Sequence, residues 1–243
     1  MQITRLVAPY VTVLTILEVS PTMFRRLFLK VPAALALAGG AGCVTAQQRR
    51  GSSASAAELS EAKDPQEARI LAVIREMSEQ GGTYLSVPIV DGKWLRILAQ
   101  ASNAKTVVEV GTSTGFSGLF FALALARTGG KLITHDIDQG RADRAKANFA
   151  KAGVSALVTQ VVGDARQTLK ALKGPIDVVF LDADKEGYVT YLDQLLPMVR
   201  SGGLILAHNT PMIPEYLAKA RANPGLETMI YGEGGGLSVS VVK

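Results

Sequence analysis

Short apolar runs and longer stretches with helical spacing alternate along most of this chain. The runs are rich in valine, isoleucine and leucine, which is typical of parallel strands buried on both faces, with helices between them. The predicted strands are residues 107–110, 131–136, 156–162, 177–181 and 203–207. The predicted helices are residues 64–79, 90–101, 118–126, 141–152, 165–172 and 188–199.

The end of the chain has a different pattern. Residues 226–231 and 237–242 are apolar and β-branched, and they flank the glycine-rich turn 232–236. Two such runs around a glycine turn predict an antiparallel hairpin. We therefore expect an α/β fold, namely a Rossmann-like, doubly wound and mostly parallel seven-stranded sheet with a C-terminal antiparallel hairpin.

The N-terminal region is predicted to be a targeting segment rather than part of the fold. Arg25 and Arg26 precede a short apolar stretch that is too short for a membrane span, as in a twin-arginine export signal. Met23 is a possible true start, and either cleavage after Ala46 or lipidation of Cys43 is compatible with the sequence.

These features predict three regions, which are a targeting segment at 1–46, a linker at 47–63 and a folded domain at 64–243. The expected location is outside the cytoplasm, either periplasmic or anchored to the membrane only through the signal or a lipid. A cytoplasmic location is the alternative.

Charge does not favour nucleic acid as a partner. The formal net charge of the chain is +5, from 26 basic and 21 acidic residues. Four of those basic residues and one of the acidic ones fall in 1–46, which leaves a net charge of +2 for the remainder. The remainder has no basic run interleaved with aromatic residues, so we expect no nucleic-acid binding.

The first predicted strand carries the most informative motif. It runs through Glu109 into a turn with Gly111 and Gly115, and a helical segment follows. A strand, a glycine turn and a helix place backbone N–H groups around a small space, and glycine lets a ligand approach the backbone. The second strand ends at Asp136, where a carboxylate can bind ribose hydroxyls. This arrangement predicts a nucleoside-cofactor site.

The spacing of these glycines disfavours a dinucleotide. A dinucleotide fingerprint reads G-x-G-x-x-G, whereas here Glu109 precedes Gly111 and three residues separate Gly111 from Gly115. An acid at that point repels a pyrophosphate but suits a ligand with an ammonium or sulfonium group. S-adenosylmethionine has both.

The other unusual polar residues also follow predicted strands. They are Asp164 with Ala165, Asp182 with Lys185, and His208 with Asn209. Because ligands of open α/β sheets bind beyond the carboxyl ends of the strands, we expect these residues in one crevice. We interpret Asp138, Asp184 and His135 as structural.

These motifs together resemble the class I S-adenosylmethionine-dependent O-methyltransferases of the bacterial catechol and caffeoyl-CoA type, over roughly residue 84 to the end. The resemblance rests on residues 109–117, 134–138, 163–165, 181–185 and 202–206. It implies transfer of a methyl group from S-adenosylmethionine to a hydroxyl of a small acceptor, phenols included, and it is compatible with a homodimer. The residues expected to bind the cofactor are Val87, Glu109, Gly111, Thr112, Ser113, Gly115, Ser117, Asp136, Asp164 and Ala165.

The resemblance breaks on the acceptor side. The family commonly binds a magnesium-type ion through an Asp equivalent to Asp182 and through a later Asp-Asn pair, and here that pair is His208-Asn209. Two hypotheses follow. In one, Asp182, His208 and Asn209 bind a softer divalent metal, since imidazole favours such ions. In the other there is no metal, and His208 is a general base oriented by Asp182. Lys185 is a further candidate base, so the expected catalytic residues are Lys185, His208 and Asp182.

Two other functions stay open at this point. One is an exported protein that binds the cofactor without catalysis. The other is an NAD-dependent oxidoreductase, which the glycine spacing disfavours.

Overall fold

The computed structural model describes residues 59–80 and 86–243. In that part of the chain, seven strands form one sheet in the order β3-β2-β1-β4-β5-β7-β6. The strands are β1 (Thr106–Val110), β2 (Lys131–Asp136), β3 (Val158–Val162), β4 (Ile176–Leu181), β5 (Val199–His208), β6 (Leu226–Tyr231) and β7 (Leu237–Val242). The first five strands are parallel, and β7 pairs antiparallel with both β5 and β6. The predicted fold class is confirmed.

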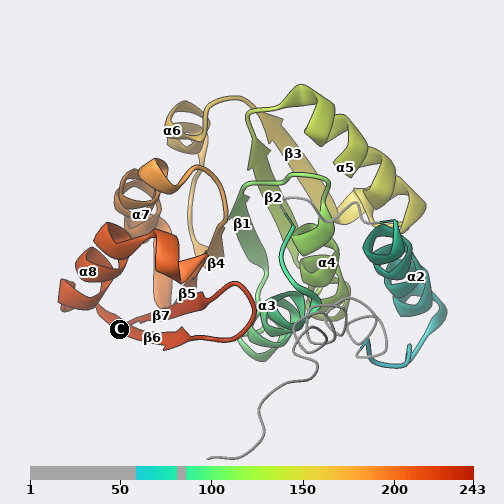
Figure 1. The fold of residues 1–243 in the computed structure, drawn as a ribbon, viewed down its shortest axis with the longest axis horizontal. Coiled ribbons are helices and arrows are strands. Elements are labelled where there is room, and N and C mark those ends of the chain that lie inside the picture. Colours follow the sequence, from blue (N-terminus) through green and yellow to red (C-terminus); the bar gives the residue numbers. More distant parts are fainter. Residues whose placement is uncertain (1–58, 81–85) are drawn as a thin grey trace, which may run out of the picture. The chain divides into compact units, whose positions relative to one another are not determined.

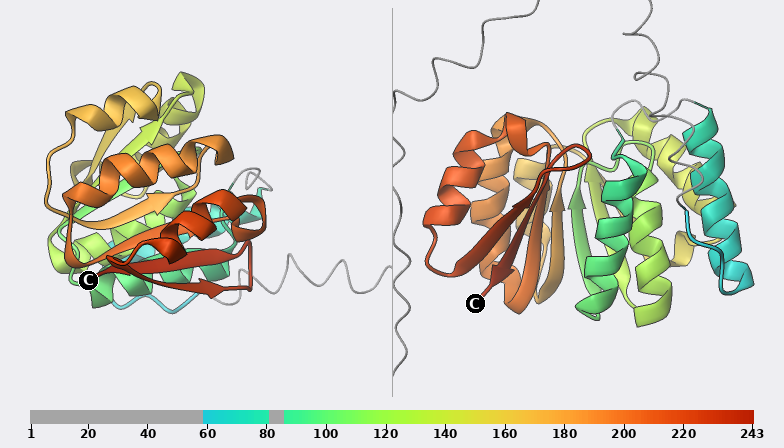
Figure 2. Two further views of the ribbon diagram at one scale, coloured as in Figure 1. Left: turned by 90° about the vertical axis from the view of Figure 1, so that its left-hand side faces the viewer. Right: turned by 60° about the horizontal axis from the view of Figure 1, so that its bottom comes forward.

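Helices cover both faces of this sheet (Figure 1, Figure 2). They are α2 (Pro65–Glu79), α3 (Ile89–Ala101), α4 (Phe116–Thr128), α5 (Gln139–Lys151), α6 (Ala165–Thr168), α7 (Tyr188–Leu195) and α8 (Pro214–Ala222). The helices α2 to α5 share a hydrophobic cluster with Val107 of β1, whereas α6 to α8 share a second cluster with the neighbouring Val108. Successive strand residues thus serve opposite layers, which is why the strand reads as a continuous apolar run.

The helix after the glycine turn is apolar on nearly every side. In α4 all residues from Phe116 to Leu125 are buried. This helix contacts α3, α2 and β2, so it lacks a solvent face and its sequence shows no amphipathic pattern. A helix held on several sides is a rigid support for the turn at its N-terminus.

Several element boundaries differ from the sequence prediction, and the largest differences involve α6, which ends at Thr168 rather than at Leu172, α7 and β5. Helix α7 ends at Leu195 rather than at Val199, and β5 begins at Val199 rather than at Gly203. The register of β4 against β5 shifts between Ile176 and Val178, so the glycine-containing segment before Leu204 forms an irregularity inside the ladder. Arg200 holds it by donating from Nε to Oδ1 of Asp177 over 2.6 Å.

The start of the folded domain follows the expected capping rules. Asp64 precedes Pro65, and its side chain accepts a hydrogen bond from the backbone N–H of Glu67 at 2.8 Å. Leu59, within the predicted linker, packs in the hydrophobic core. The targeting segment and the rest of the linker lie outside the described residues. None of the helices in 59–80 and 86–243 combines the length and apolar character that a membrane span requires.

Candidate active site

One cavity of about 780 Å³ lies at the carboxyl ends of β1, β2, β3, β4 and β5. Its volume falls in the range of small-molecule sites. The predicted site residues that line it are Gly111, Ser113, Asp136, Asp164, Ala165, Asp182, Lys185, His208 and Asn209. The expectation that the strand-end motifs meet in one crevice is therefore confirmed by their placement.

The other predicted cofactor residues lie behind the cavity wall. Glu109, Thr112 and Ser117 are buried, and so is Val87, whose neighbour Ser86 does line the cavity. Gly115 is the left-handed residue at the start of α4, with φ of 87°. A direct contact of these five residues with a cofactor stays a prediction.

The turn after β1 approaches the end of β4 closely. Gly111 has φ of 109°, and a Cβ on it would lie 2.2 Å from the backbone oxygen of Asp182. Its N–H donates to the carbonyl of His135 at 2.8 Å, which ties the turn to β2. Only glycine fits this conformation and this distance. The turn after β1 therefore packs directly against the end of β4, and this contact connects the two sides of the cavity.

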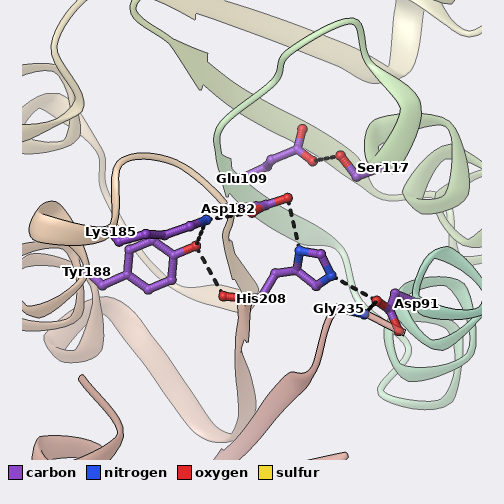
Figure 3. Close-up of polar contacts among 8 residues, drawn as sticks. All are labelled: Asp91, Glu109, Ser117, Asp182, Lys185, Tyr188, His208 and Gly235. Atoms are coloured by element: carbon purple, nitrogen blue, oxygen red, sulfur yellow. Dashed lines mark hydrogen bonds and ion pairs between the residues drawn. The ribbon is translucent and has the colours of Figure 1, made fainter. Parts of the chain in front are cut away.

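Glu109 is a buried carboxyl group surrounded by hydroxyls. Ser117 Oγ donates to its Oε1 at 2.5 Å (Figure 3). Thr134 Oγ1 donates to its Oε2 at 2.6 Å. Burial raises the pKa of Glu109 to about 7, because the two hydroxyl hydrogen bonds offset only part of the desolvation and Asp182 and Asp136 add negative charge nearby. This acid is close to half-protonated at neutral pH.

Asp136 is held rigidly by backbone donors. The N–H of Ser113 reaches its Oδ2 at 2.7 Å, and the N–H of Asp138 reaches its Oδ1 at 2.9 Å. Asp138 in turn caps α5, as expected, by accepting from the N–H of Arg141 at 2.8 Å. A carboxylate fixed in this way at the cavity edge is suited to hydroxyls of a sugar.

The remaining strand ends contribute polar groups as well. Asp164 accepts from the backbone N–H of Arg166 at 2.9 Å at the start of α6. Asp184, interpreted from the sequence as structural, precedes the 3-10 turn Lys185–Gly187, and its side chain pairs with Arg166 at 2.5 Å and accepts from the Tyr191 hydroxyl. His135 is buried, and its Nδ1 lies 2.9 Å from the Thr168 hydroxyl, in agreement with a structural role.

The opposite side of the cavity holds a chain of charged groups (Figure 3). Lys185 Nζ lies 3.0 Å from Oδ1 of Asp182 and donates to the Tyr188 hydroxyl at 2.9 Å. His208 Nδ1 lies 3.3 Å from Oδ2 of the same Asp182. Burial alone raises the pKa of Asp182, but the hydrogen bonds and charges of His208 and Lys185 outweigh it and hold that pKa below its usual value.

A residue that sequence reasoning missed completes this chain. Asp91, fully buried in the first turn of α3, lies 2.8 Å through Oδ2 from Nε2 of His208. Burial lowers the pKa of His208, yet Asp182 and Asp91 together raise it to about 9. One signal was present in the sequence, since Asp91 stands four residues before Leu95 and eight before Ala99 on the buried face of its helix.

This geometry bears on both hypotheses for His208. Nε2 of His208 is hydrogen-bonded to Asp91, whereas Nδ1 lies 3.3 Å from Asp182 and has no hydrogen-bond partner among the described residues, so general-base catalysis by His208 stays a prediction. The residues do not fit a divalent ion, because Asp182 is shared between a lysine and the imidazole. No group of three or more His, Cys, Asp or Glu in residues 59–80 and 86–243 is arranged to hold a metal, so an ion here would also depend on the amide of Asn209. Lys185 is the candidate base that the arrangement favours.

The fold and the cavity define the class of protein. The strands of a Rossmann-like sheet end at one cavity. A glycine turn beside a buried acid follows one strand, a carboxylate suited to ribose ends a second, and a lysine with a carboxylate partner follows a third, across the cavity. These parts belong to an S-adenosylmethionine-dependent methyltransferase.

Comparison with known proteins agrees and is more specific. The O-methyltransferase family model matches residues 60–219. The catechol O-methyltransferase of Niastella koreensis is 35% identical over 162 residues, which cover 65% of this chain and 73% of that protein. The catechol O-methyltransferase of Mycobacterium tuberculosis is 39% identical over 126 residues, which cover 51% of this chain and 57% of that protein.

A solved structure shows the same fold. The O-methyltransferase from Bacillus cereus in complex with SAH has a TM-score of 0.68 at 22% identity, with 80% of this chain and 99% of that chain covered. The chain belongs to the O-methyltransferase family, and the resemblance found in the sequence is confirmed.

Proposed function

We propose that this O-methyltransferase transfers the methyl group of S-adenosylmethionine to the hydroxyl of a small, phenolic acceptor. The observation that carries the proposal is that Lys185, paired with Asp182, lines the same cavity as Asp136 and Gly111. Donor and acceptor can thus lie side by side in one space. The relatives named catechol O-methyltransferase support a phenolic hydroxyl as the acceptor.

The donor occupies the side formed by β1, β2 and β3 in this proposal. Glu109 lies behind the wall at the methionine end, Asp136 binds the ribose hydroxyls, and Asp164 with Ala165 borders the adenine. Asp136 is well suited because Ser113 and Asp138 fix both of its oxygens. A pre-oriented carboxylate loses little freedom when a ligand binds.

The acceptor occupies the side formed by β4 and β5. Its hydroxyl oxygen attacks the methyl carbon in line with the sulfonium sulfur, the C–S bond breaks with its electron pair going to sulfur, and S-adenosylhomocysteine leaves. The hydroxyl proton goes to Nζ of Lys185 in its neutral form.

Calorimetry tests the donor half of the proposal. S-adenosylmethionine and S-adenosylhomocysteine are each titrated into the purified protein, with NAD as the comparison. We expect saturable binding of the first two and none of NAD. Absence of heat with both methionine-derived ligands, or saturable binding of NAD alone, would overturn the proposal.

Transfer assays test the acceptor half. A panel of mono- and dihydroxylated phenols is incubated with labelled S-adenosylmethionine, and aliphatic alcohols of similar size serve as the control. We expect methylation of phenols only. Cofactor binding without transfer to any member of the panel would instead support the non-catalytic binding protein.

For the N-terminal region we infer export, with a targeting segment at 1–46, a linker at 47–63 and the catalytic domain from 64. The paired arginines before a short apolar stretch support this reading. N-terminal sequencing of the protein from fractionated cells tests it. A mature chain beginning near residue 47, or at a lipidated Cys43, in the periplasmic or membrane fraction is expected. An uncleaved chain in the cytoplasm would contradict it.

A homodimer is the assembly state that we propose, by analogy with the family only. Light scattering after gel filtration measures the molar mass directly. A mass equal to one chain of 25.7 kDa or its processed form would contradict the proposal.

A further inference from the structure

His208 bridges two elements that are far apart in the sequence (Figure 3). It lies at the end of β5, with Asp91 of α3 on one side and Asp182, after β4, on the other. The distances are 2.8 Å from Nε2 to Asp91 and 3.3 Å from Nδ1 to Asp182. The ring and Asp91 are almost completely shielded from solvent, at 3% and 0% exposure.

The hydrogen-bonding geometry sets the character of the ring. A carboxylate oxygen only accepts hydrogen bonds, so Nε2, which is hydrogen-bonded to Asp91, carries a hydrogen. Nδ1 makes no hydrogen bond to a described residue but lies 3.3 Å from Oδ2 of Asp182, and a carboxylate on each side of the ring favours its cationic form. A positive group therefore lies beside Asp182, where the family commonly has its metal ion.

A glycine loop covers the same imidazole. The N–H of Gly235, between β6 and β7, donates to Oδ2 of Asp91 at 2.8 Å. A Cβ on Gly235 would lie 2.4 Å from Nε2 of His208, and one on Gly234 would lie 2.3 Å from Asp91 Oδ1. The backbone of this loop thus packs against the Nε2 side of the ring and against Asp91.

We propose that the His208 side chain, clamped between Asp91 and Asp182, replaces the divalent cation of the acceptor site, so that methyl transfer by this chain is independent of metal. In this arrangement His208 and Asp91 are positioning residues. They neutralise Asp182 and fix it at the distance from Lys185 that the reaction uses. The inference rests on the proposed function for its activity readouts.

The first experiment measures metal binding by the unaltered protein. Chelator-dialysed protein is titrated with Mg²⁺, Mn²⁺ and Zn²⁺ in a calorimeter, and transfer is assayed with and without EDTA. We expect no saturable heat with any of the three ions and a transfer rate within about twofold in EDTA. Metal binding that saturates at one ion per chain would overturn the proposal. So would a transfer rate that falls roughly tenfold or more in EDTA and is restored by the ion.

The failure of the two proposals can be told apart in the same samples. S-adenosylmethionine is titrated into the chelator-dialysed protein alongside the metals. If no cofactor binds and no transfer occurs under any condition, the proposed function is wrong. The metal titrations would still show whether His208, between Asp91 and Asp182, replaces an ion.

A gain-of-function variant sharpens the test. In His208→Asp combined with Asp91→Asn, carboxylate and amide oxygens replace the imidazole and its partner, and such oxygens suit hard divalent ions. We expect this variant to acquire saturable Mg²⁺ or Mn²⁺ binding and a melting temperature that rises with the ion. A stable variant that binds no ion would contradict the idea that the imidazole occupies the cation's place.

The role of Asp91 is tested by Asp91→Asn alone. A positioning role predicts a kcat lowered by about 10- to 100-fold with an unchanged KM for S-adenosylmethionine. Asp193→Asn is the matched control, since Asp193 pairs with Lys219 on the surface at 2.6 Å, and it should leave both constants unchanged. An Asp91→Asn enzyme with wild-type kcat would exclude the proposed role.

Discussion

The buried carboxyl groups on the two sides of the cavity have pKa values shifted in opposite directions. On the donor side, Glu109 is surrounded by hydroxyls, and burial raises its pKa to about 7. On the acceptor side, Asp182 is paired with His208 and Lys185, which hold its pKa below the usual value. Among the described residues Glu109 therefore has no cationic partner, which a ligand with an ammonium and a sulfonium group would supply. The acceptor side contains its cations already.

This difference suggests how the two halves are specialised. A desolvated carboxyl group with a raised pKa gains most from a positively charged ligand. The positive charge compensates for the hydration that the carboxylate loses on burial. A carboxylate that is already neutralised attracts cations weakly and instead fixes the groups around it. The following predictions test that contrast, from the largest expected effect to the smallest.

Lys185→Met should have the largest effect, and it should be confined to transfer. Removal of a general base lowers kcat by about 10²- to 10⁴-fold, while the donor side is unaffected and cofactor affinity should stay the same. Steady-state kinetics and calorimetry measure the two quantities. Lys170→Met is the control, since Lys170 is exposed and donates to the side chain of Gln167. If Lys185→Met retained wild-type kcat, the acceptor side would need another base.

Gly235→Ala should destabilise the acceptor side. The added methyl group would overlap the His208 ring, and overpacking of this kind costs about 1–3 kcal/mol of unfolding free energy. Gly232→Ala is a matched control in the same loop, since a Cβ there meets nothing within 4 Å. Urea unfolding of both variants measures the difference. Equal stability of the two would show that the loop does not press on the imidazole.

The affinity for S-adenosylmethionine should rise as the pH rises through about 7, the pKa of Glu109 in the free protein. Below that pH the carboxyl is protonated and must release its proton to pair with the ligand, so affinity at pH 6 should be roughly tenfold lower than at pH 8. Calorimetry in buffers of different ionisation enthalpy measures the released proton. Glu109→Gln should bind weakly at both pH values, with no proton release.

The same shift has the opposite sign for the stability of the free protein. The folded pKa of Glu109 lies above its usual value of 4.5, so the unfolded chain loses the proton first. The stabilising contribution is present below pH 4.5 and is lost as the pH rises to about 7. Urea unfolding without ligand should show that slope in the wild type and lose it in Glu109→Gln.

Asp138→Ala should have the smallest effect. It removes the cap of α5 and lowers the unfolding free energy by about 1 kcal/mol. The backbone N–H that holds Asp136 remains, so cofactor affinity should stay within about twofold. Thermal unfolding and calorimetry give the two numbers. A large loss of affinity would mean that the cap itself positions the ribose carboxylate.

Much of the fold was readable from the sequence because local signals and tertiary structure agree. The valine run of β1 is buried on both faces, and the apolar stretch of α4 is enclosed by its neighbours. Prediction failed where a tertiary contact overrides the local signal. Residues around Gly202 look like a loop, but the Arg200–Asp177 pair holds them within the ladder of β5.

The candidate site divides in the same manner. Residues that follow strands were found because the topology brings all strand ends to one edge. Asp91 lies on a helix far from those motifs, and only the packing of α3 against the end of β5 brings it to His208. A sequence can mark such a residue as an acid on an apolar face, but its partner becomes known only from the structure.

The position of β7 between β5 and β6 sets an order of assembly during synthesis. All residues assigned to the donor side have been synthesised once α6 has been made. The acceptor side additionally needs the Gly235 loop and β7, the strand that follows it. Until residue 242 has left the ribosome, β5 has an unpaired edge that is apolar and able to pair with other chains. A chain that stalls before that point would be exposed to aggregation at β5.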